Sequence, residues 1–375
     1  MPYEEALQKK LEELKQEYAK TKYNKATDKH LGLLRARMAK IRRELELIKV
    51  RKSKKGIGFG VRKNGDATVV LVGFPTAGKS SLLERLTNAK AKITGHAFTT
   101  LDVIPGVLYY NGAHIQILDI PGLIEGAHIG KGQGIKVASV IRIADLLAFV
   151  IDINAQNQLE VLLEELDQLG IKVNKQKPAI SLEKTDKGGI EINSQMSSEI
   201  KREMIELLNG MGIYNAKVSV PQGTDIDEIE DALLESTTYV KGIVALNKID
   251  IARKEFEEEA KKIEEKHKMK VVPISAKEGT NIEALKQAIF EEVGLIRVYL
   301  QPKTGAEKVN VGEPMVVKRG STVLEVAKKL NSKTAQALRF AYVTGKSVKF
   351  ARQKVGREHV LEDEDVVTLI YDRHL

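Results

Sequence analysis

Residues 69–80 read Val-Val-Leu-Val-Gly-Phe-Pro-Thr-Ala-Gly-Lys-Ser. The apolar run Val69 to Val72 predicts a buried β-strand, which Gly73 ends. From Gly73 the spacing is G-x-x-x-x-G-K-S, a pattern that places a glycine-rich loop between a strand and a helix, the latter expected over 81–86. Glycines let the backbone N–H groups of such a loop point at phosphate oxygens, and the helix N-terminus adds positive potential. The stretch therefore predicts a phosphate-binding loop in an α/β domain with a mostly parallel sheet.

The loop also assigns roles to two side chains. Lys79 would pair with the β- and γ-phosphates of a nucleotide, and the Ser80 hydroxyl would ligate Mg²⁺. The predicted nucleotide-binding residues of this stretch are Gly73, Pro75, Thr76, Ala77, Gly78, Lys79, Ser80 and Ser81.

The composition is that of a globular protein with more than one domain. Its 375 residues suggest two or three domains, with 42% hydrophobic and 30% charged residues. The sequence has no run of 18 apolar residues and no signal-peptide profile, so we expect a cytoplasmic protein without a membrane partner. The absence of cysteine excludes disulfides and thiolate metal sites.

Positive charge is concentrated near the N-terminus. Residues 1–63 contain 19 Lys/Arg and 8 Asp/Glu, a surplus of 11, whereas the rest of the chain contains 41 and 43. Such asymmetry suggests a polyanionic partner, with RNA or the ribosome as the first candidate. The alternative is a solvated helical face without a partner.

Residues 1–55 predict a basic helical hairpin. Two apolar series at heptad-like spacing, 7–18 and 34–48, are separated by the polar stretch 21–30, so an antiparallel pair of helices is expected. A basic connector with several glycines then leads into the nucleotide domain, predicted over 56–295.

Downstream of the phosphate loop, Phe98, Thr99 and Thr100 lie in a predicted loop. A threonine here can supply an oxygen to Mg²⁺ and sense the γ-phosphate. The residue types alone leave the choice between the two threonines open.

A predicted β-hairpin of strands 107–110 and 113–118 delivers the stretch Asp119-Ile120-Pro121-Gly122. Its carboxylate, Asp119, would lie near Mg²⁺, and the Gly122 N–H would lie near the γ-phosphate. The glycine-rich segment up to residue 134 can order in one nucleotide state and relax in the other.

A guanine-reading pattern follows two later strands. Asn247-Lys248-Ile249-Asp250 comes after the apolar run 243–246, and Ser275-Ala276-Lys277 comes after 271–274. The Asp250 carboxylate would accept from the ring N1–H and the exocyclic amine, an edge that adenine lacks. The Lys248 stem would cover the ring, and the backbone of residues 275–277 would receive the guanine O6. An ATPase is therefore disfavoured.

Residues 170–238 interrupt the nucleotide domain and predict a small α+β insertion. Strands near 179–182 and 189–192 flank Lys184-Thr185-Asp186-Lys187-Gly188, so a hairpin is expected, followed by helices over 198–211 and 226–236. The insertion shows no recognisable chemistry.

Residues 296–375 predict a compact β-grasp module. Strands over 297–301 and 315–318, a helix over 322–330 and a closing strand over 366–371 fit this architecture. The module is rich in Lys and Arg, while its acids cluster at 362–365, so a basic face for RNA is one reading and a solubilising surface is the other.

With these residues in place, the chain resembles the developmentally regulated GTP-binding proteins (DRG), a family of the Obg superfamily of translation-factor-class GTPases. The resemblance covers nearly the full length. It implies that an N-terminal helical hairpin, an insertion like the second domain of ribosomal protein S5, and a C-terminal TGS domain flank a GTPase core. The motifs that carry it are Gly65-Asp66-Ala67, Gly73-Phe74-Pro75, Phe98-Thr99-Thr100-Leu101, Asp119-Ile120-Pro121-Gly122, Glu125-Gly126-Ala127 and the glycine run to Gly134.

The resemblance also implies site residues and partners. It makes Thr100 the second hydroxyl ligand of Mg²⁺ beside Ser80, with Asp119 as the acidic member of the metal site. It makes Lys79, Thr100 and Gly122 the catalytic group, and it implies GTP and GDP as ligands. Association with the ribosome or its RNA, and a stabilising or activating protein partner, are implied in the same way.

Two positions depart from related GTPases. Leu123 stands where small signalling GTPases carry a glutamine that orients the attacking water, so slow intrinsic hydrolysis is expected. Thr76 stands where several relatives carry an asparagine that holds K⁺; threonine offers one weaker oxygen, so activation by K⁺ does not follow from the resemblance.

Two functional hypotheses result. The first is a GTP-hydrolysing switch that docks on the ribosome or RNA through its basic ends. The second is a nucleotide-regulated RNA-binding or scaffold protein in which hydrolysis is incidental. Stimulation of single-turnover hydrolysis by ribosomes would favour the first.

Overall fold

The computed structural model describes residues 2–20, 41, 45, 65–87, 104–120, 137, 140–194, 196–210, 212–224, 228–229, 237–252, 256–302, 312–331 and 334–372. The chain divides into two compact units. The smaller unit contains Met1–Gly60 and Leu166–Tyr239, and the larger unit contains Val61–Glu165 and Val240–Leu375. None of the described helices combines the length and the apolar character that a membrane span needs.

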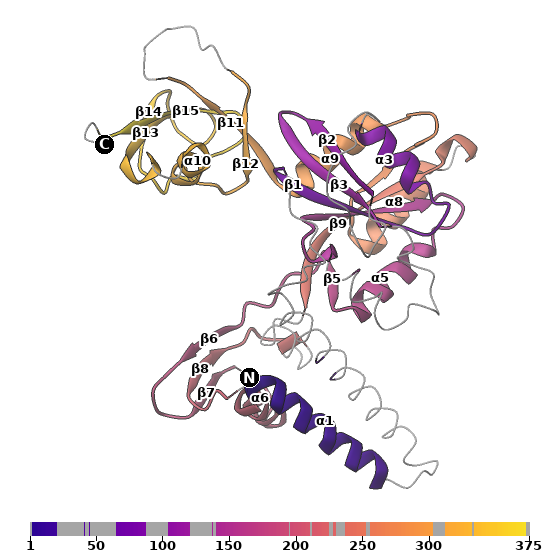
Figure 1. The fold of residues 1–375 in the computed structure, drawn as a ribbon, viewed down its shortest axis with the longest axis vertical. Helices are drawn as coiled ribbons and strands as arrows, with labels where there is room; N and C mark the ends of the chain where they lie inside the picture. The colour runs from indigo at the N-terminus through magenta and orange to yellow at the C-terminus, as the bar shows by residue number, and fades with distance from the viewer. Residues whose placement is uncertain are drawn as a thin grey trace. The chain divides into compact units, whose positions relative to one another are not determined.

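The larger unit contains the sheet that the phosphate loop follows (Figure 1). Its strand order is β10-β9-β4-β1-β3-β2, and all neighbours along it are parallel except β2 and β3. The predicted hairpin is confirmed: Asn111 and Gly112 both have positive φ, 49° and 79°, as the expected two-residue turn requires. The strands are β1 (Ala67–Val72), β2 (Ile104–Tyr110), β3 (Ala113–Asp119), β4 (Leu146–Asp152), β9 (Thr238–Asn247) and β10 (Val271–Pro273).

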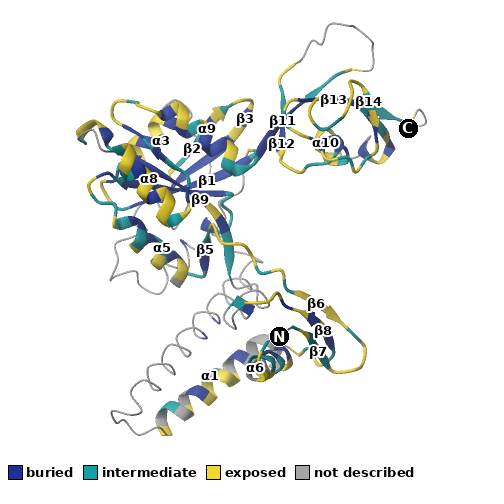
Figure 2. Cartoon of the chain, turned by 180° about the vertical axis from the view of Figure 1, so that it is seen from behind, coloured by how far each residue is buried: buried dark blue, intermediate teal, exposed yellow. Residues whose placement is uncertain are grey.

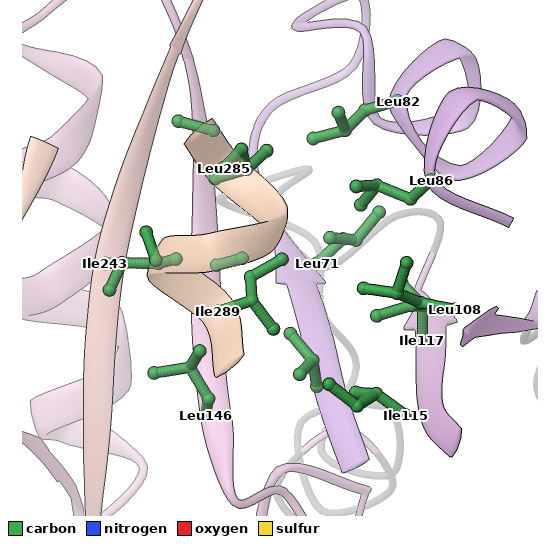
Figure 3. Close-up of a cluster of buried hydrophobic side chains, with 14 of the residues drawn as sticks. Leu71, Leu82, Leu86, Leu108, Ile115, Ile117, Leu146, Ile243, Leu285 and Ile289 are labelled. Carbon is green, nitrogen blue, oxygen red and sulfur yellow. The ribbon is translucent and has the colours of Figure 1, made fainter. Parts of the chain in front are cut away.

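Burial on both faces explains the continuous apolar runs of these strands. All six residues of β1 are buried, as expected for a central strand of a parallel sheet covered on two sides. On one face, leucines and isoleucines of α3 and α9 pack against the strands (Figure 3). The helices of this domain are α3 (Lys79–Thr87), α5 (Gln158–Gln168), the 3₁₀ turn η3 (Ile249–Ile251), α8 (Phe256–His267) and α9 (Ile282–Val293).

A second sheet of the larger unit matches the predicted β-grasp module. Its order is β12-β11-β15-β13-β14, and its core includes Val323, Val326 and Ala327 of α10. Thr322 and Glu325 form a capping box that fixes the start of α10. The elements are β11 (Leu295–Leu300), β12 (Met315–Lys318), α10 (Val323–Leu330), the 3₁₀ turn η4 (Thr334–Ala337), β13 (Leu338–Thr344), β14 (Gln353–Val355) and β15 (Asp365–Tyr371).

In the smaller unit, the predicted α+β insertion forms a sheet with the order β6-β8-β7. The expected hairpin between the first two of its strands is wrong, because β8 lies between them and pairs with both. The apolar side chains of β8, Ala216 and Val218, are buried against Met204 and Leu208 of the helix, which makes β8 the natural centre. The elements of the insertion are β6 (Ser181–Lys184), β7 (Ile190–Asn193), α6 (Ser198–Gly210) and β8 (Ala216–Ser219), whereas the preceding β5 (Ile171–Val173) pairs with β9.

The N-terminal helix α1 (Pro2–Lys20) belongs to the same unit. Its Leu7 and Leu14 are buried in one cluster with Ile41 and Leu45, so residues of both predicted apolar series meet. The remainder of the second predicted helix, the basic connector, and most of the helix expected over 226–236 lie outside the described residues.

Candidate functional site

The predicted nucleotide-binding segments gather at one edge of the parallel sheet. The phosphate loop follows β1, Asp119 ends β3, and the two predicted base-reading segments follow β9 and β10. Because β1, β3, β9 and β10 run in the same direction, their carboxyl ends meet at one edge, where ligands bind in open α/β sheets.

The phosphate loop is shaped by close backbone packing. A Cβ on Gly73 would lie 2.4 Å from the Val150 carbonyl oxygen, and one on Gly78 would lie 2.3 Å from Asn247 Nδ2. Gly78 also has a φ of 96°, a left-handed conformation that glycine adopts without strain. Space thus requires glycine at both positions, and the backbone conformation requires it at Gly78 as well.

Lys79 is drawn back over this loop. Its side chain is only 8% exposed, and Nζ donates to the carbonyl oxygens of Gly73 at 2.9 Å and Phe74 at 3.0 Å. Two of its protons are used in this way, so the third can be directed to a phosphate oxygen. Burial lowers the pKa of Lys79, while the nearby Asp119 acts to raise it.

Ser80 and Asp119 are the two described residues predicted to ligate the metal. Ser80 Oγ donates to Asp119 Oδ2 at 3.0 Å, and Asp119 Oδ1 is buried with no hydrogen-bond partner among the residues that the structure describes. Burial raises the pKa of Asp119, and the Ser80 hydrogen bond and the Lys79 charge oppose this change. A hydroxyl beside a buried carboxylate with an unsatisfied oxygen is the hard oxygen donor set that Mg²⁺ prefers, so these residues fit the predicted metal.

Asn247 connects the phosphate loop to the predicted base-reading loop. Its Nδ2 donates to the Ala77 carbonyl at 2.8 Å, and its Oδ1 accepts from the Ala276 N–H at 2.9 Å. Asn247 is 2% exposed, so both bonds are shielded from water. One side chain therefore holds the two loops at a fixed separation.

Asp250 and Ser275 lie together in the base-reading region. Ser275 Oγ donates to Asp250 Oδ1 at 2.6 Å and accepts from the Glu278 N–H at 3.0 Å. This arrangement orients the Asp250 carboxylate, and no described residue bonds to its Oδ2. The neighbouring Lys277 has a side chain that is 80% exposed, so a role for this residue would come from its backbone.

Two residues without a predicted role support this region. Asp152, at the end of β4, accepts from Lys248 Nζ at 2.7 Å, and Lys248 has a left-handed φ of 69°. Arg85 of α3 donates to the carbonyl oxygens of Ala276, at 3.0 Å from Nε, and Lys277. The position of Asp152 at a strand end was a visible signal, whereas nothing in the sequence pattern indicated Arg85.

Several predicted site residues lie outside the described residues. They are Phe98, Thr99, Thr100, Gly122 and Leu123. The remaining predicted residues lie within the described ranges. Gly73 to Gly78 form the phosphate loop, Lys79 to Ser81 begin α3, Asp119 ends β3, and those from Asn247 to Lys277 lie at or just after the ends of β9 and β10.

Comparison with protein families gives three matches that follow one another along the chain. Residues 68–184 match the family described as 50S ribosome-binding GTPase, and residues 187–295 match the C-terminal region of MMR_HSR1 domain. Residues 296–371 match the TGS domain.

Relatives align over almost the whole chain. A GTP-binding protein of Methanocaldococcus jannaschii is 38% identical over 98% of this chain and 93% of its own length. Developmentally-regulated GTP-binding protein 1 of Xenopus laevis is also 38% identical, over 96% of this chain and 98% of its own length. Among solved structures, the Schizosaccharomyces pombe YchF GTPase has a TM-score of 0.48 at 14% identity, over 82% of this chain and 99% of that chain.

Proposed function

Since the chain belongs to the developmentally regulated GTP-binding proteins, with a P-loop GTPase domain and a TGS domain, we propose that it is a magnesium-dependent GTPase that acts as a molecular switch on the ribosome. The observation that carries this proposal is the double hydrogen bond of Asn247, which joins the phosphate loop to the loop beside Asp250. Loops held together in this way would bind the phosphate end and the base end of one nucleotide at the same time.

Guanine selection rests on Asp250. Its carboxylate would accept from the N1–H and the amino group of guanine, with Ser275 keeping it in place. The Ala276 N–H is already bonded to Asn247, so the guanine O6 would be met by a neighbouring N–H of the same loop. Lys248, braced by Asp152, would lie along the base plane.

Hydrolysis transfers the γ-phosphoryl group of GTP to water and yields GDP and phosphate. Lys79 and the N–H groups of the phosphate loop would bind the β- and γ-oxygens and stabilise the charge that develops on them. Ser80 and Asp119, with Thr100 by family resemblance, would hold Mg²⁺, which when bound neutralises charge on the same oxygens. The Gly122 N–H would contact the γ-phosphate.

Slow intrinsic turnover is part of the proposal. Leu123 cannot form a hydrogen bond to the attacking water, so backbone groups or a partner must orient it. A GTPase of this kind gains rate when a partner completes the site, which suits a switch that acts at a docking surface.

The ribosome is proposed as the docking partner on two grounds. The matched family of residues 68–184 carries ribosome binding in its description, and residues 1–63 have a surplus of 11 positive charges. A basic segment of this size is suited to the phosphates of ribosomal RNA.

Calorimetric titration with GDP and a non-hydrolysable GTP analogue tests the pocket. Binding is expected with Mg²⁺ and should weaken strongly for the analogue when Mg²⁺ is chelated or Lys79 is changed to Ala. Folded protein that takes up no guanine nucleotide in the presence of Mg²⁺ would overturn the proposal.

Single-turnover hydrolysis with and without ribosomes tests the switch. Stimulation by ribosomes is the expected result, and the same assay in KCl and NaCl reports whether Thr76 supports activation by K⁺.

Leu123 favours a second candidate, a nucleotide-regulated RNA-binding scaffold, because it removes the glutamine route to hydrolysis. Unchanged hydrolysis on ribosomes that bind the protein would favour the scaffold.

A further inference from the structure

The outer face of the C-terminal sheet carries adjacent aromatic rings. Phe340 and Tyr342 alternate along β13 with Ala341 and Val343, which are buried in the core that α10 covers. The two aromatic side chains therefore lie on the opposite face of the sheet, where both are half-buried. Their rings meet edge to face with centroids 5.5 Å apart.

Cations lie directly over these rings. Lys354 Nζ is 4.4 Å from the centroid of Phe340, and Arg352 Cζ is 5.8 Å from the centroid of Tyr342. Lys354 is the cross-strand neighbour of Tyr342 in the β13–β14 pair, so it rises from the same face. Both cations are exposed, and an exposed cation is held over a ring only weakly. They can therefore leave the rings to meet a ligand.

The surrounding chain adds positive charge and another ring. Residues 326–357 contain nine Lys/Arg and no Asp/Glu. In the turn between β13 and β14, Phe350 is 64% exposed and follows the exposed Lys349. Figure 2 shows exposed and half-buried residues over this hairpin. A phenylalanine that is largely exposed among cations gains little from burial, and it fits a ligand that is both flat and anionic.

We propose that the surface of Phe340, Tyr342, Arg352 and Lys354, together with Phe350 in the adjoining turn, binds single-stranded RNA by stacking unpaired bases on its rings. The inference rests on the RNA part of the proposed function and deepens it, since it names the surface and the kind of RNA. It does not depend on GTP hydrolysis.

The combination of rings and cations selects unpaired RNA over other polyanions. A base stacks on an aromatic ring through its face, which is accessible in a single strand and covered by neighbouring base pairs in a duplex. The cations beside each ring match the phosphates that flank a base. A purely electrostatic surface would bind duplex RNA at least as well, because its charge density is higher.

The experiment measures fluorescence anisotropy of the full chain with labelled RNA of about 12 nucleotides, as an unstructured single strand and as a duplex. Tighter binding of the single strand is expected. Phe350→Ala should weaken single-strand binding about tenfold, as expected for one lost stacking contact. The double change Arg352→Ala with Lys354→Ala should weaken it and should lower the slope of log affinity against log salt by about 2.

Matched controls come from the insertion. Tyr214 is 66% exposed, so Tyr214→Ala removes an equally accessible ring, and Lys175→Ala with Lys177→Ala removes the same charge from exposed positions. These variants should bind the single strand like the parent protein, and all variants should keep its melting temperature and its GDP affinity.

The outcomes separate this inference from the proposed function. The inference alone would be overturned if the parent chain bound the duplex as tightly as the single strand. It would also be overturned if Phe350→Ala and the Arg352→Ala, Lys354→Ala double variant bound like the controls. If the chain bound the single strand through this surface but did not bind GTP, the inference would be supported and the proposed function overturned.

Discussion

Asp250 is the side chain on which base selection would depend under the proposed function, and its environment makes a sharp test possible. Ser275 donates to Oδ1, which fixes the orientation of the carboxylate that would meet the base. In Asp250→Asn an amide group replaces one acceptor, and it can donate to the carbonyl that xanthine carries where guanine has its amino group. We expect GTP affinity to fall at least about tenfold, as for a lost charged hydrogen bond, and xanthosine triphosphate affinity to rise. Competition binding measures both, and a retained preference for GTP would contradict the base assignment.

Lys79 and Asp119 are buried where ligand binding would need their charges, and burial of a charged group lowers the stability of the folded protein. Burial raises the pKa of Asp119 above its ordinary value of 3.8, so the unfolded chain ionises at lower pH than the folded one. Asp119 therefore lowers the free energy of unfolding progressively as pH rises from about 3.8 through its raised pKa. At neutral pH this destabilisation is present in full.

Asp119→Asn should remove this cost. We expect the melting temperature of the nucleotide-free protein to rise by about 1–3 °C at neutral pH and the gain to vanish below the ordinary pKa of the carboxyl. Mg²⁺-dependent strengthening of GTP binding should be lost in the same variant. Thermal unfolding across pH measures the first effect and calorimetry the second; a lower melting temperature at neutral pH would show that the Lys79 attraction outweighs the burial of Asp119.

At the scale of elements, the strands with continuous apolar runs were predictable and the pairing of short strands was not. β1 and the hairpin of β2 and β3 followed from local pattern and from Asn111-Gly112. The order β6-β8-β7 depends on which strand fills the core beneath α6, and that is decided by packing among residues distant in sequence. The sequence did not predict β13 and β14, because aromatic and cationic residues on their outer face interrupt the simple apolar–polar alternation of a strand.

The candidate site divides in the same way. Motif spacing indicated Lys79, Ser80 and Asp250, because these roles are tied to loops that follow a strand directly. Asp152 stands at a visible strand end, but its partner Lys248 lies 96 residues away, so the sequence did not show what it contacts. Arg85 contacts a carbonyl 191 residues away, and no local pattern indicated it. Asn247 was predicted as a base reader, but its bond to Ala77 in the phosphate loop was not.

Arg85 links the helix after the phosphate loop to the loop that would meet the base. Arg85→Ala removes two charged hydrogen bonds to backbone carbonyls, and we expect GDP affinity to fall about threefold to tenfold, with the partial exposure of Arg85 limiting the effect. Arg85→Lys should have a smaller effect, because lysine keeps the charge but lacks the guanidinium fork. Calorimetry with GDP measures both variants; equal affinities for Arg85→Ala and the parent would show that α3 does not support the loop.

At the scale of the whole molecule, charge and nucleotide chemistry lie in different parts of the sequence. The N-terminal 63 residues hold the positive surplus, while the segments of the candidate nucleotide site lie between residues 73 and 277. A switch with this organisation must report its nucleotide state through segments near the γ-phosphate, and the glycine-rich stretch 122–134 is placed in sequence to do so.

Ribosome binding should therefore depend both on nucleotide and on salt. We expect more protein to cosediment with ribosomes in the presence of a GTP analogue than with GDP, because an ordered switch segment favours the docked state. Raising salt from about 50 to 200 mM should release the protein, since each phosphate contact gives up bound counterions. Changing Arg51, Lys52, Lys54 and Lys55 to Gln should flatten the salt dependence, while the nucleotide dependence should persist. Lys79→Ala keeps the N-terminal cations and weakens triphosphate binding, so it should keep the salt dependence and lose the nucleotide dependence. If both variants responded identically, ribosome docking and nucleotide binding would not be carried by separate groups.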